Sequence, residues 1–257
     1  MCEEEIVITK RCAESWLKRI RNLAGFLGMI LPWIALVGAS IVAKAKPEAI
    51  PDDFWETLSI SATYYLTPSL TGILTTAAIV LMCYKGYDWK DELVTTISGI
   101  FGLMVVVFPC DCSLAKGTVG FFQLPVSVSD KIHCTAAVLF FLLLAINSIF
   151  LFTLGESNTP QKRIRNIIYK VCGIGMFSTL ILLLLPIEFS AKIFVVETIA
   201  LTFFGVSWLV KGQVFGLLAD KPACCTAASP TDVSADATAE TSSDISSDAD
   251  DNQDVGC

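Results

Sequence analysis

The stretch that most constrains this chain covers residues 132–153, IHCTAAVLFFLLLAINSIFLFT. It carries no formal charge over about 22 residues, which form about 33 Å of α-helix at 1.5 Å per residue. The hydrocarbon core of a bilayer is about 30 Å thick, so the stretch predicts a membrane-spanning helix. It also holds His133, the only histidine among 257 residues, near its start.

Weaker apolar stretches lie on both sides of this one, and hydrophobic residues make up 54% of the chain. Soluble domains contain about 45–50% apolar residues, so the excess favours a membrane protein. We expect an all-α, polytopic fold, a bundle of six transmembrane helices. The predicted spans cover about residues 23–43, 66–83, 93–109, 132–153, 167–187 and 193–210.

Lys and Arg residues are divided unevenly between the two sides of these spans. Thirteen of the 18 fall on the side of the two chain ends, and five fall on the other. Because cytoplasmic loops carry the excess of Lys and Arg, both ends are predicted to be cytosolic. The acidic start MCEEEIVITK differs from the basic start of a cleavable signal peptide, so we expect the first span to be retained.

The two ends of the chain differ in composition from residues 23–211, the predicted membrane domain. Residues 1–22 are interpreted as a cytosolic amphipathic lead, with Trp16 and basic residues suited to a headgroup interface. Residues 212–257 are interpreted as a disordered acidic cytosolic tail. From Asp220 onward there are nine acids and one lysine, which accounts for the net charge of −7. No basic stripe indicates nucleic-acid binding.

Several local strings together carry a family resemblance that covers about residues 59–212. They are SISATYY at 59–65, YKGYD at 84–88, FP at 108–109, the single His133, FLFT at 150–153, RNIIYKVCG at 165–173 and ETIALTFFGVSWLVKG at 197–212. The set resembles a family of uncharacterised six-span bacterial integral membrane proteins. It is more loosely similar to the DRAM/Frag/Sfk type of six-span protein. The bacterial resemblance implies the inner (cytoplasmic) membrane and no defined activity, and the eukaryotic one implies lipid handling or membrane trafficking.

His133 and Glu197 are the sharpest functional candidates. Glu197 lies about four residues into its predicted span, about 6 Å from the outer end, and His133 lies at a similar depth. Ionisable side chains inside a membrane face the bundle interior and commonly mark functional sites. Asp111, Tyr64 and Tyr65 can reach the same level. Two interpretations stay open, a polar pocket that opens outward and a single hydrogen bond between helices that fixes their packing.

Three cysteines lie near the same outer helix ends, Cys110 and Cys112 beside Asp111 and Cys134 beside His133. Thiolates and imidazole suit zinc or copper, but this spacing matches no known metal signature, so no metal site is predicted. A disulfide among these cysteines is the stronger interpretation if that face is oxidising. The alternative is that they serve as small apolar residues.

A catalytic interpretation needs a serine beside His133. A Ser–His–acid relay could use Ser59, Ser61 or Ser129, but their spacing gives no support for it. We therefore predict no catalytic residues and lean towards a protein that is not an enzyme. No cofactor is predicted.

The predicted cytosolic turns carry a second set of candidates. Lys85 lies in one turn, and Lys162, Arg163 and Arg165 lie in another. They are interpreted as contacts to anionic lipid headgroups. Solvated turns that obey the positive-inside rule are the simpler alternative.

The leading hypothesis is a protein that binds or senses a lipid or small amphiphile in an outward-facing polar pocket. Membrane lipids are its expected partners. A small proton-coupled transporter is the first alternative, although residues 23–109 and 132–210 show no internal repeat. A lipid-modifying membrane enzyme is the second alternative.

Overall fold

The computed structural model describes residues 2–86, 88–154, 159–187 and 189–214. Six α-helices make up most of these residues: α1 Cys2–Ala45, α2 Ser69–Met82, α3 Trp89–Val107, α4 Val126–Ile146, α5 Pro160–Leu184 and α6 Lys192–Lys211. Shorter elements are the 3₁₀-helices η1 Pro47–Ala49 and η2 Ser61–Tyr65, the π-helical turn η3 Asn147–Leu151, and the paired strands β1 Thr118–Val119 and β2 Leu124–Pro125. The tail predicted for 212–257 lies, from residue 215 onward, outside the described residues.

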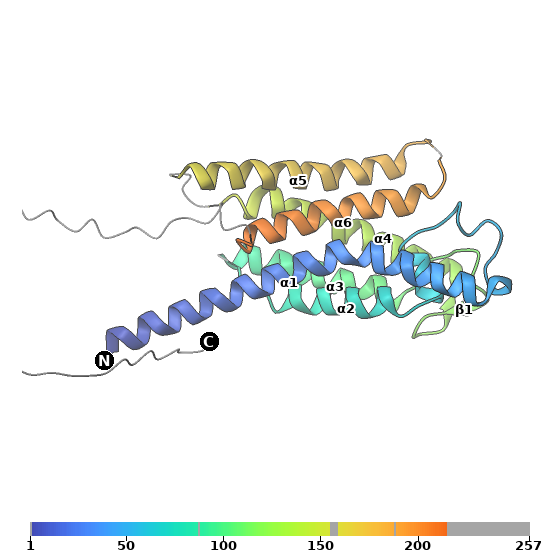
Figure 1. Cartoon of the computed structure of the whole chain (residues 1–257), viewed down its shortest axis with the longest axis horizontal. Helices are drawn as coiled ribbons and strands as arrows, with labels where there is room; N and C mark the ends of the chain where they lie inside the picture. Colours follow the sequence, from blue (N-terminus) through green and yellow to red (C-terminus); the bar gives the residue numbers. More distant parts are fainter. Residues whose placement is uncertain (1, 87, 155–158, 188, 215–257) are drawn as a thin grey trace, which may run out of the picture. The chain divides into compact units, whose positions relative to one another are not determined.

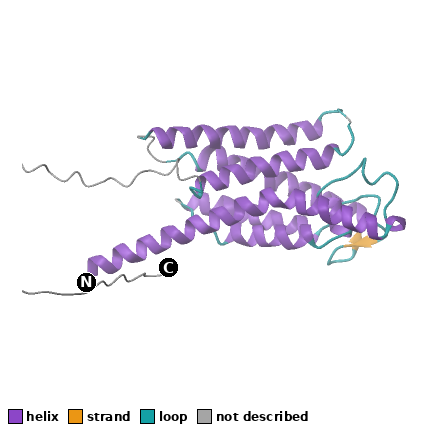
Figure 2. Cartoon of the chain, in the orientation of Figure 1, coloured by secondary structure: helices purple, strands orange, loops and turns teal. Residues whose placement is uncertain are grey.

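The six helices form a ring in sequence order. Each packs against its neighbours along the chain, and α6 closes the ring against α1 (Figure 1). The β1–β2 hairpin and the longer loops gather at one end of the helices, as Figure 2 shows. We call this the loop end, and it carries residues 46–68, residues 108–125 and the start of α6. Short sequential connections favour this antiparallel arrangement of neighbours.

Four helices are long and apolar enough to cross a bilayer: Ser15–Ala45 within α1, Val126–Leu151, Pro160–Leu184 and Lys192–Lys211. These helices identify a membrane protein. α2 has 14 residues, about 21 Å of helix. α3 has 19, but three charged residues in its first turn leave 93–107 as its apolar part. The structure therefore gives four helices of spanning length, where the sequence predicts six spans.

Two helices begin earlier than predicted, for local reasons. α1 is continuous from Cys2, so no break separates the predicted lead 1–22 from the first span; residues 1–22 contain no proline or glycine to end a helix. α4 begins at Val126, directly after Pro125, rather than at 132. Asp130 and Lys131 are helical and mark an interfacial first turn instead of a loop. His133 therefore lies about two turns inside the helix.

The boundaries of α2, α3 and α5 follow their capping residues. α5 begins at Pro160 because Thr159 caps it, its hydroxyl accepting a hydrogen bond from the Lys162 N–H at 3.2 Å. α3 is capped by the Asp88 side chain. It ends at Val107, since the residue before Pro109 adopts an extended backbone. α2 begins one residue after Pro68.

Large apolar side chains cover both the inside and the outside of the ring. Trp208, Phe204 and Leu144 are buried in its core. Trp33 and Ile167 face outward with 60% and 62% of their surface exposed. A helix that is apolar all round is typical of a membrane span, because lipid covers the outer face.

Glycines bring α1 and α6 into close contact and so close the ring. Gly25 and Gly205 face one another, and a Cβ atom on Gly205 would lie 2.8 Å from the Gly25 carbonyl oxygen. Small residues on both partners allow this backbone approach between membrane helices. In water and in lipid alike, such a packed contact leaves no room for a methyl group.

We predict that Gly205→Ala lowers the thermal unfolding temperature in detergent, by an overpacking penalty of about 1–3 kcal/mol. Gly72→Ala is the matched control, because a Cβ atom there meets nothing within 4 Å. That control should unfold at or slightly above the wild-type temperature, since alanine favours helix over glycine. Equal unfolding temperatures for the two variants would show that the α1–α6 contact is looser than the structure has it.

Candidate functional site

The site is built where the segment before α2 meets the start of α6. The N–H groups of Ala191 and Phe194 donate to the carbonyl oxygens of Glu56 and Leu58, at 2.7 and 3.1 Å. The first N–H groups of a helix have no partner within the helix, so these bonds complete the α6 terminus. They also hold residues 56–60 against α6 and bring η2 to the bundle interior.

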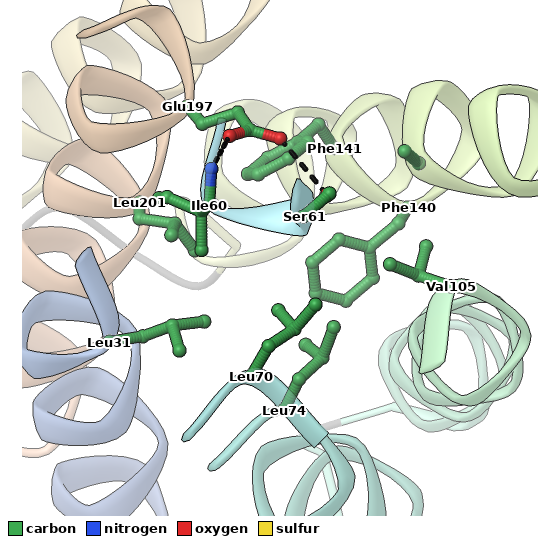
Figure 3. Close-up of a pocket in the computed structure, with 11 residues that line it drawn as sticks. Leu31, Ile60, Ser61, Leu70, Leu74, Val105, Phe140, Phe141, Glu197 and Leu201 are labelled. Carbon is green, nitrogen blue, oxygen red and sulfur yellow. Dashed lines mark hydrogen bonds between the residues drawn. The ribbon is translucent and has the colours of Figure 1, made fainter. Parts of the chain in front are cut away.

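Glu197, one turn further along α6, continues this attachment. Its Oε2 accepts a hydrogen bond from the Ile60 backbone N–H at 2.6 Å. Its Oε1 accepts one from the Ser61 hydroxyl, with an oxygen–oxygen distance of 3.2 Å. Figure 3 shows the carboxylate reaching from α6 to both residues. The loop backbone thus satisfies the carboxylate, and the carboxylate satisfies the loop, away from water.

His133 approaches Ser61 from the opposite side. Its Nδ1 lies 2.7 Å from the Phe108 carbonyl oxygen and 3.1 Å from that of Val105. Carbonyl oxygens only accept hydrogen bonds, so Nδ1 carries a hydrogen. Its Nε2 lies 3.1 Å from Ser61 Oγ, and the imidazole is 4% exposed. The end of α3 therefore fixes the orientation of the ring, with Nε2 directed at the serine.

Ser61 joins the two ionisable groups but has one proton to donate. When Glu197 is ionised, the hydroxyl donates to the carboxylate, and Nε2 of a protonated His133 donates to Ser61. When Glu197 is protonated, it donates to Ser61, and the hydroxyl donates to Nε2 of a neutral His133. Both arrangements satisfy every atom of the row, and each has no net charge.

A cavity of about 230 Å³ adjoins this row at the loop end. Its polar lining consists of Ser59, Ser61, Cys110, Asp111, Asp130, His133, Cys134 and Glu197, and its apolar lining consists of Ala137, Val138, Phe141, Leu180, Leu183 and Ile193. The apolar residues belong to α4, α5 and α6, and Val138 and Ile193 are each 46% exposed on the outer surface. The cavity is therefore polar on one side and apolar on the side that faces lipid.

A smaller cavity of about 40 Å³ lies on the other side of Ser61 and Glu197. Apart from those two side chains, its lining is mainly leucine, valine and phenylalanine, including Leu31, Leu74 and Phe140 (Figure 3). An apolar cavity of this kind stays dry. Ser61 and Glu197 thus separate a polar cavity from an apolar core.

The structure brings three of the five predicted pocket residues to one cavity, namely His133, Glu197 and Asp111. Tyr65 is outside the lining: its hydroxyl donates to the Cys110 carbonyl oxygen at 2.8 Å, and burial raises its pKa. Tyr64 stacks edge-on against Tyr65.

The sequence interpretation left out the serines and Asp130. Ser59 and Ser61 lie in the string SISATYY, which the resemblance included, so two hydroxyls around an isoleucine were the available signal. Asp130 Oδ1 accepts a hydrogen bond from the Asp111 backbone N–H at 2.8 Å and so ties the loop to α4. Nothing in its spacing indicated this contact.

The three cysteines are free thiols in this structure. Cys134 donates to Asp130 at 3.6 Å, whereas Cys110 and Cys112 hydrogen-bond one another. That bond lowers the pKa of Cys112 to about 7, and the same bond together with burial raises the pKa of Cys110. Among the described residues, no group of three or more His, Cys, Asp or Glu side chains is placed to hold a metal ion.

The predicted headgroup contacts lie at the opposite end and do not form one surface. Lys85 and Arg163 are exposed, but Arg165 is 6% exposed and buried beside the core. Lys162 Nζ donates to the Leu154 carbonyl oxygen at 2.9 Å. Of the four, Lys85 and Arg163 are the side chains most accessible to a lipid surface.

That opposite end is closed by aromatic and charged side chains. Tyr84 donates to Asp91 at 3.1 Å, and burial raises its pKa to about 12. Lys211 Nζ lies 4.8 Å from the centre of the Phe152 ring. Trp208 stacks edge-on against Tyr84 and Phe152. This end is tightly packed, in contrast to the loop end.

Comparison of the chain with family models, curated proteins and solved structures gives no match. The resemblance to six-span bacterial proteins therefore stays a prediction. The site is interpreted from its geometry alone.

We predict that Cys112 reacts with a maleimide with a pH midpoint near 7, because the thiolate is the reactive form and its fraction rises through that pH. Cys110→Ala removes the hydrogen bond that stabilises the thiolate. Its midpoint should therefore move to higher pH, and the rate at pH 7 should fall. The measurement is peptide mapping of alkylation against pH, with exposed Cys83 as the reference thiol. A midpoint unchanged in Cys110→Ala would contradict this assignment.

Proposed function

We propose that this membrane protein binds a lipid or small amphiphile in the 230 Å³ cavity at its loop end. The observation that carries the proposal is the two-sided lining. Hydroxyl, imidazole and carboxyl groups stand on one side, and aliphatic side chains of α4, α5 and α6 stand on the other. Ligand sites combine an apolar wall with a few placed polar groups in this way.

The partly exposed wall favours a ligand from the bilayer over one from water. Val138 and Ile193 reach from the cavity to the outer face of the helices. An acyl chain on these residues could continue into surrounding lipid, while its polar group lies near His133, Asp111 and Asp130. A ligand that is wholly polar would leave the apolar wall unfilled.

The proposal includes six spans with both ends in the cytosol, in the inner membrane of a bacterium. The excess of Lys and Arg on one side supports the orientation. The ring supports the number of spans, because α2 and α3 complete it beside the four helices of spanning length. The loop end then faces outward.

A proton-coupled carrier has less support from the geometry. A carrier needs polar groups that continue across the membrane. Beyond Ser61 and Glu197 the next cavity is lined mainly by Leu31, Leu70, Leu74 and other apolar residues. The polar row ends there among the described residues.

We expect native mass spectrometry of the protein in mild detergent to show about one retained lipid per chain. Glu197→Gln and His133→Ala should each reduce the retained fraction several-fold, because each changes the polar side of the cavity. Glu92→Gln is the matched control, since it makes the same change at an exposed carboxylate of α3, and it should retain lipid as the wild type does. A bare chain in every variant, or equal retention in all of them, would contradict the proposal.

The orientation has its own test, because cysteines lie at both ends of the ring. In variants that keep only Cys112 or only Cys83, a membrane-impermeant maleimide added to intact cells should label Cys112. Cys83, at the end of α2, should be labelled only after the membrane is opened. The reverse pattern would place the loop end in the cytosol.

A further inference from the structure

We propose that Ser61 is a nucleophile that accepts an acyl group from an ester-bearing amphiphile, with His133 as its general base. This inference rests on the proposed function, because the ester must lie in the same cavity. The observation that carries it is the contact of 3.1 Å between Ser61 Oγ and His133 Nε2 at the cavity wall. A hydroxyl is a weak nucleophile until a base stands beside it.

The imidazole is held as such a base must be. The carbonyl oxygens of Phe108 and Val105 accept from Nδ1–H, which leaves Nε2 to take a proton. In Ser–His–Asp enzymes a carboxylate has this orienting role, and here two backbone carbonyls have it. The contact between nucleophile and base falls within the range of about 2.6–3.2 Å that marks an activated pair.

The reaction balances with water as the second reactant. Ser61 Oγ attacks the ester carbonyl carbon, and its proton moves to Nε2. The bond from that carbon to the leaving alkoxide breaks, and the proton on Nε2 passes to the alkoxide, releasing an alcohol. Water then attacks the acyl-serine with His133 again as base, which releases the carboxylic acid and restores the hydroxyl. An acceptor alcohol in place of water gives acyl transfer.

Two groups beside Ser61 can stabilise the negative charge that develops on the carbonyl oxygen. They are the Ile60 N–H and, in its protonated form, the Glu197 carboxyl. Fixed donors beside a developing oxyanion contribute strongly to acyl-transfer catalysis. Glu197 must release Ile60 to a substrate, so its hydrogen bond occupies the place of the oxyanion in the unliganded protein.

Ser59 gives an internal comparison. It lines the same cavity and is as buried as Ser61, with 7% and 8% of their surfaces exposed. Its hydroxyl oxygen accepts the Ala62 N–H at 2.9 Å, while His133 Nε2 contacts Ser61. The two serines therefore share a cavity but differ in having a base.

The test is labelling of the purified full-length protein with an alkyl fluorophosphonate, which phosphonylates activated serines with loss of fluoride. Peptide mass spectrometry should find the adduct on Ser61. Labelling should vanish in Ser61→Ala, fall at least ten-fold in His133→Gln, and stay unchanged in Ser59→Ala. Thermal unfolding of each variant checks its fold, and mapping of the wild-type adduct decides the matter if a variant does not fold.

The outcomes separate this inference from the proposed function. Retained lipid without an adduct on Ser61 overturns the acyl transfer and leaves a binding cavity. An adduct on Ser59, or one that persists in a folded His133→Gln variant, overturns the assignment of nucleophile or base. An adduct on Ser61 that depends on His133 supports the inference even where no lipid survives purification.

Discussion

The structure depends on how the backbone before α2 is satisfied beside the membrane helices. Non-helical backbone at that depth needs protein partners for its N–H and C=O groups. The start of α6 supplies them, because Ala191 and Phe194 donate to loop carbonyls and Glu197 accepts from Ile60. A glutamate in an apolar helix is costly unless it is bonded in this way. The same bonds bring Ser61 between Glu197 and His133, so the site is a consequence of how the loop is held.

The two ends of the ring differ in how they are closed, and this makes the site one-sided. At the opposite end, Trp208 packs against Phe204, Tyr84 and Phe152, and Lys211 lies over the Phe152 ring. At the loop end the helices α4, α5 and α6 leave a cavity that reaches the outer surface. Large side chains fill one end at the packing density of a protein interior, while the other keeps room for a ligand. A chamber closed at one end suits binding or catalysis better than passage across a membrane.

Much of the fold was predictable because its signals are local. Apolar runs predicted helices close to α4 and α6, and the missed starts at Val126 and Pro160 follow from prolines and caps that hydropathy does not weigh. Glu197 and His133 were predictable as a pair from charge and depth. Ser61 was not, because its place depends on the route of residues 46–68, which have no periodicity to fix a register. Tyr64 and Tyr65 share the string with Ser61 but point elsewhere for the same reason.

The single proton of Ser61 links binding to chemistry in this site. Its hydroxyl can donate either to Glu197 or to His133 Nε2, and only the second arrangement activates it. An ionised Glu197 competes with the base for that proton, so the unliganded site holds the nucleophile in check. A ligand whose carbonyl oxygen takes the Ile60 N–H displaces the carboxylate and leaves His133 as the partner of the hydroxyl. The residue that anchors the loop therefore also decides when the serine is reactive.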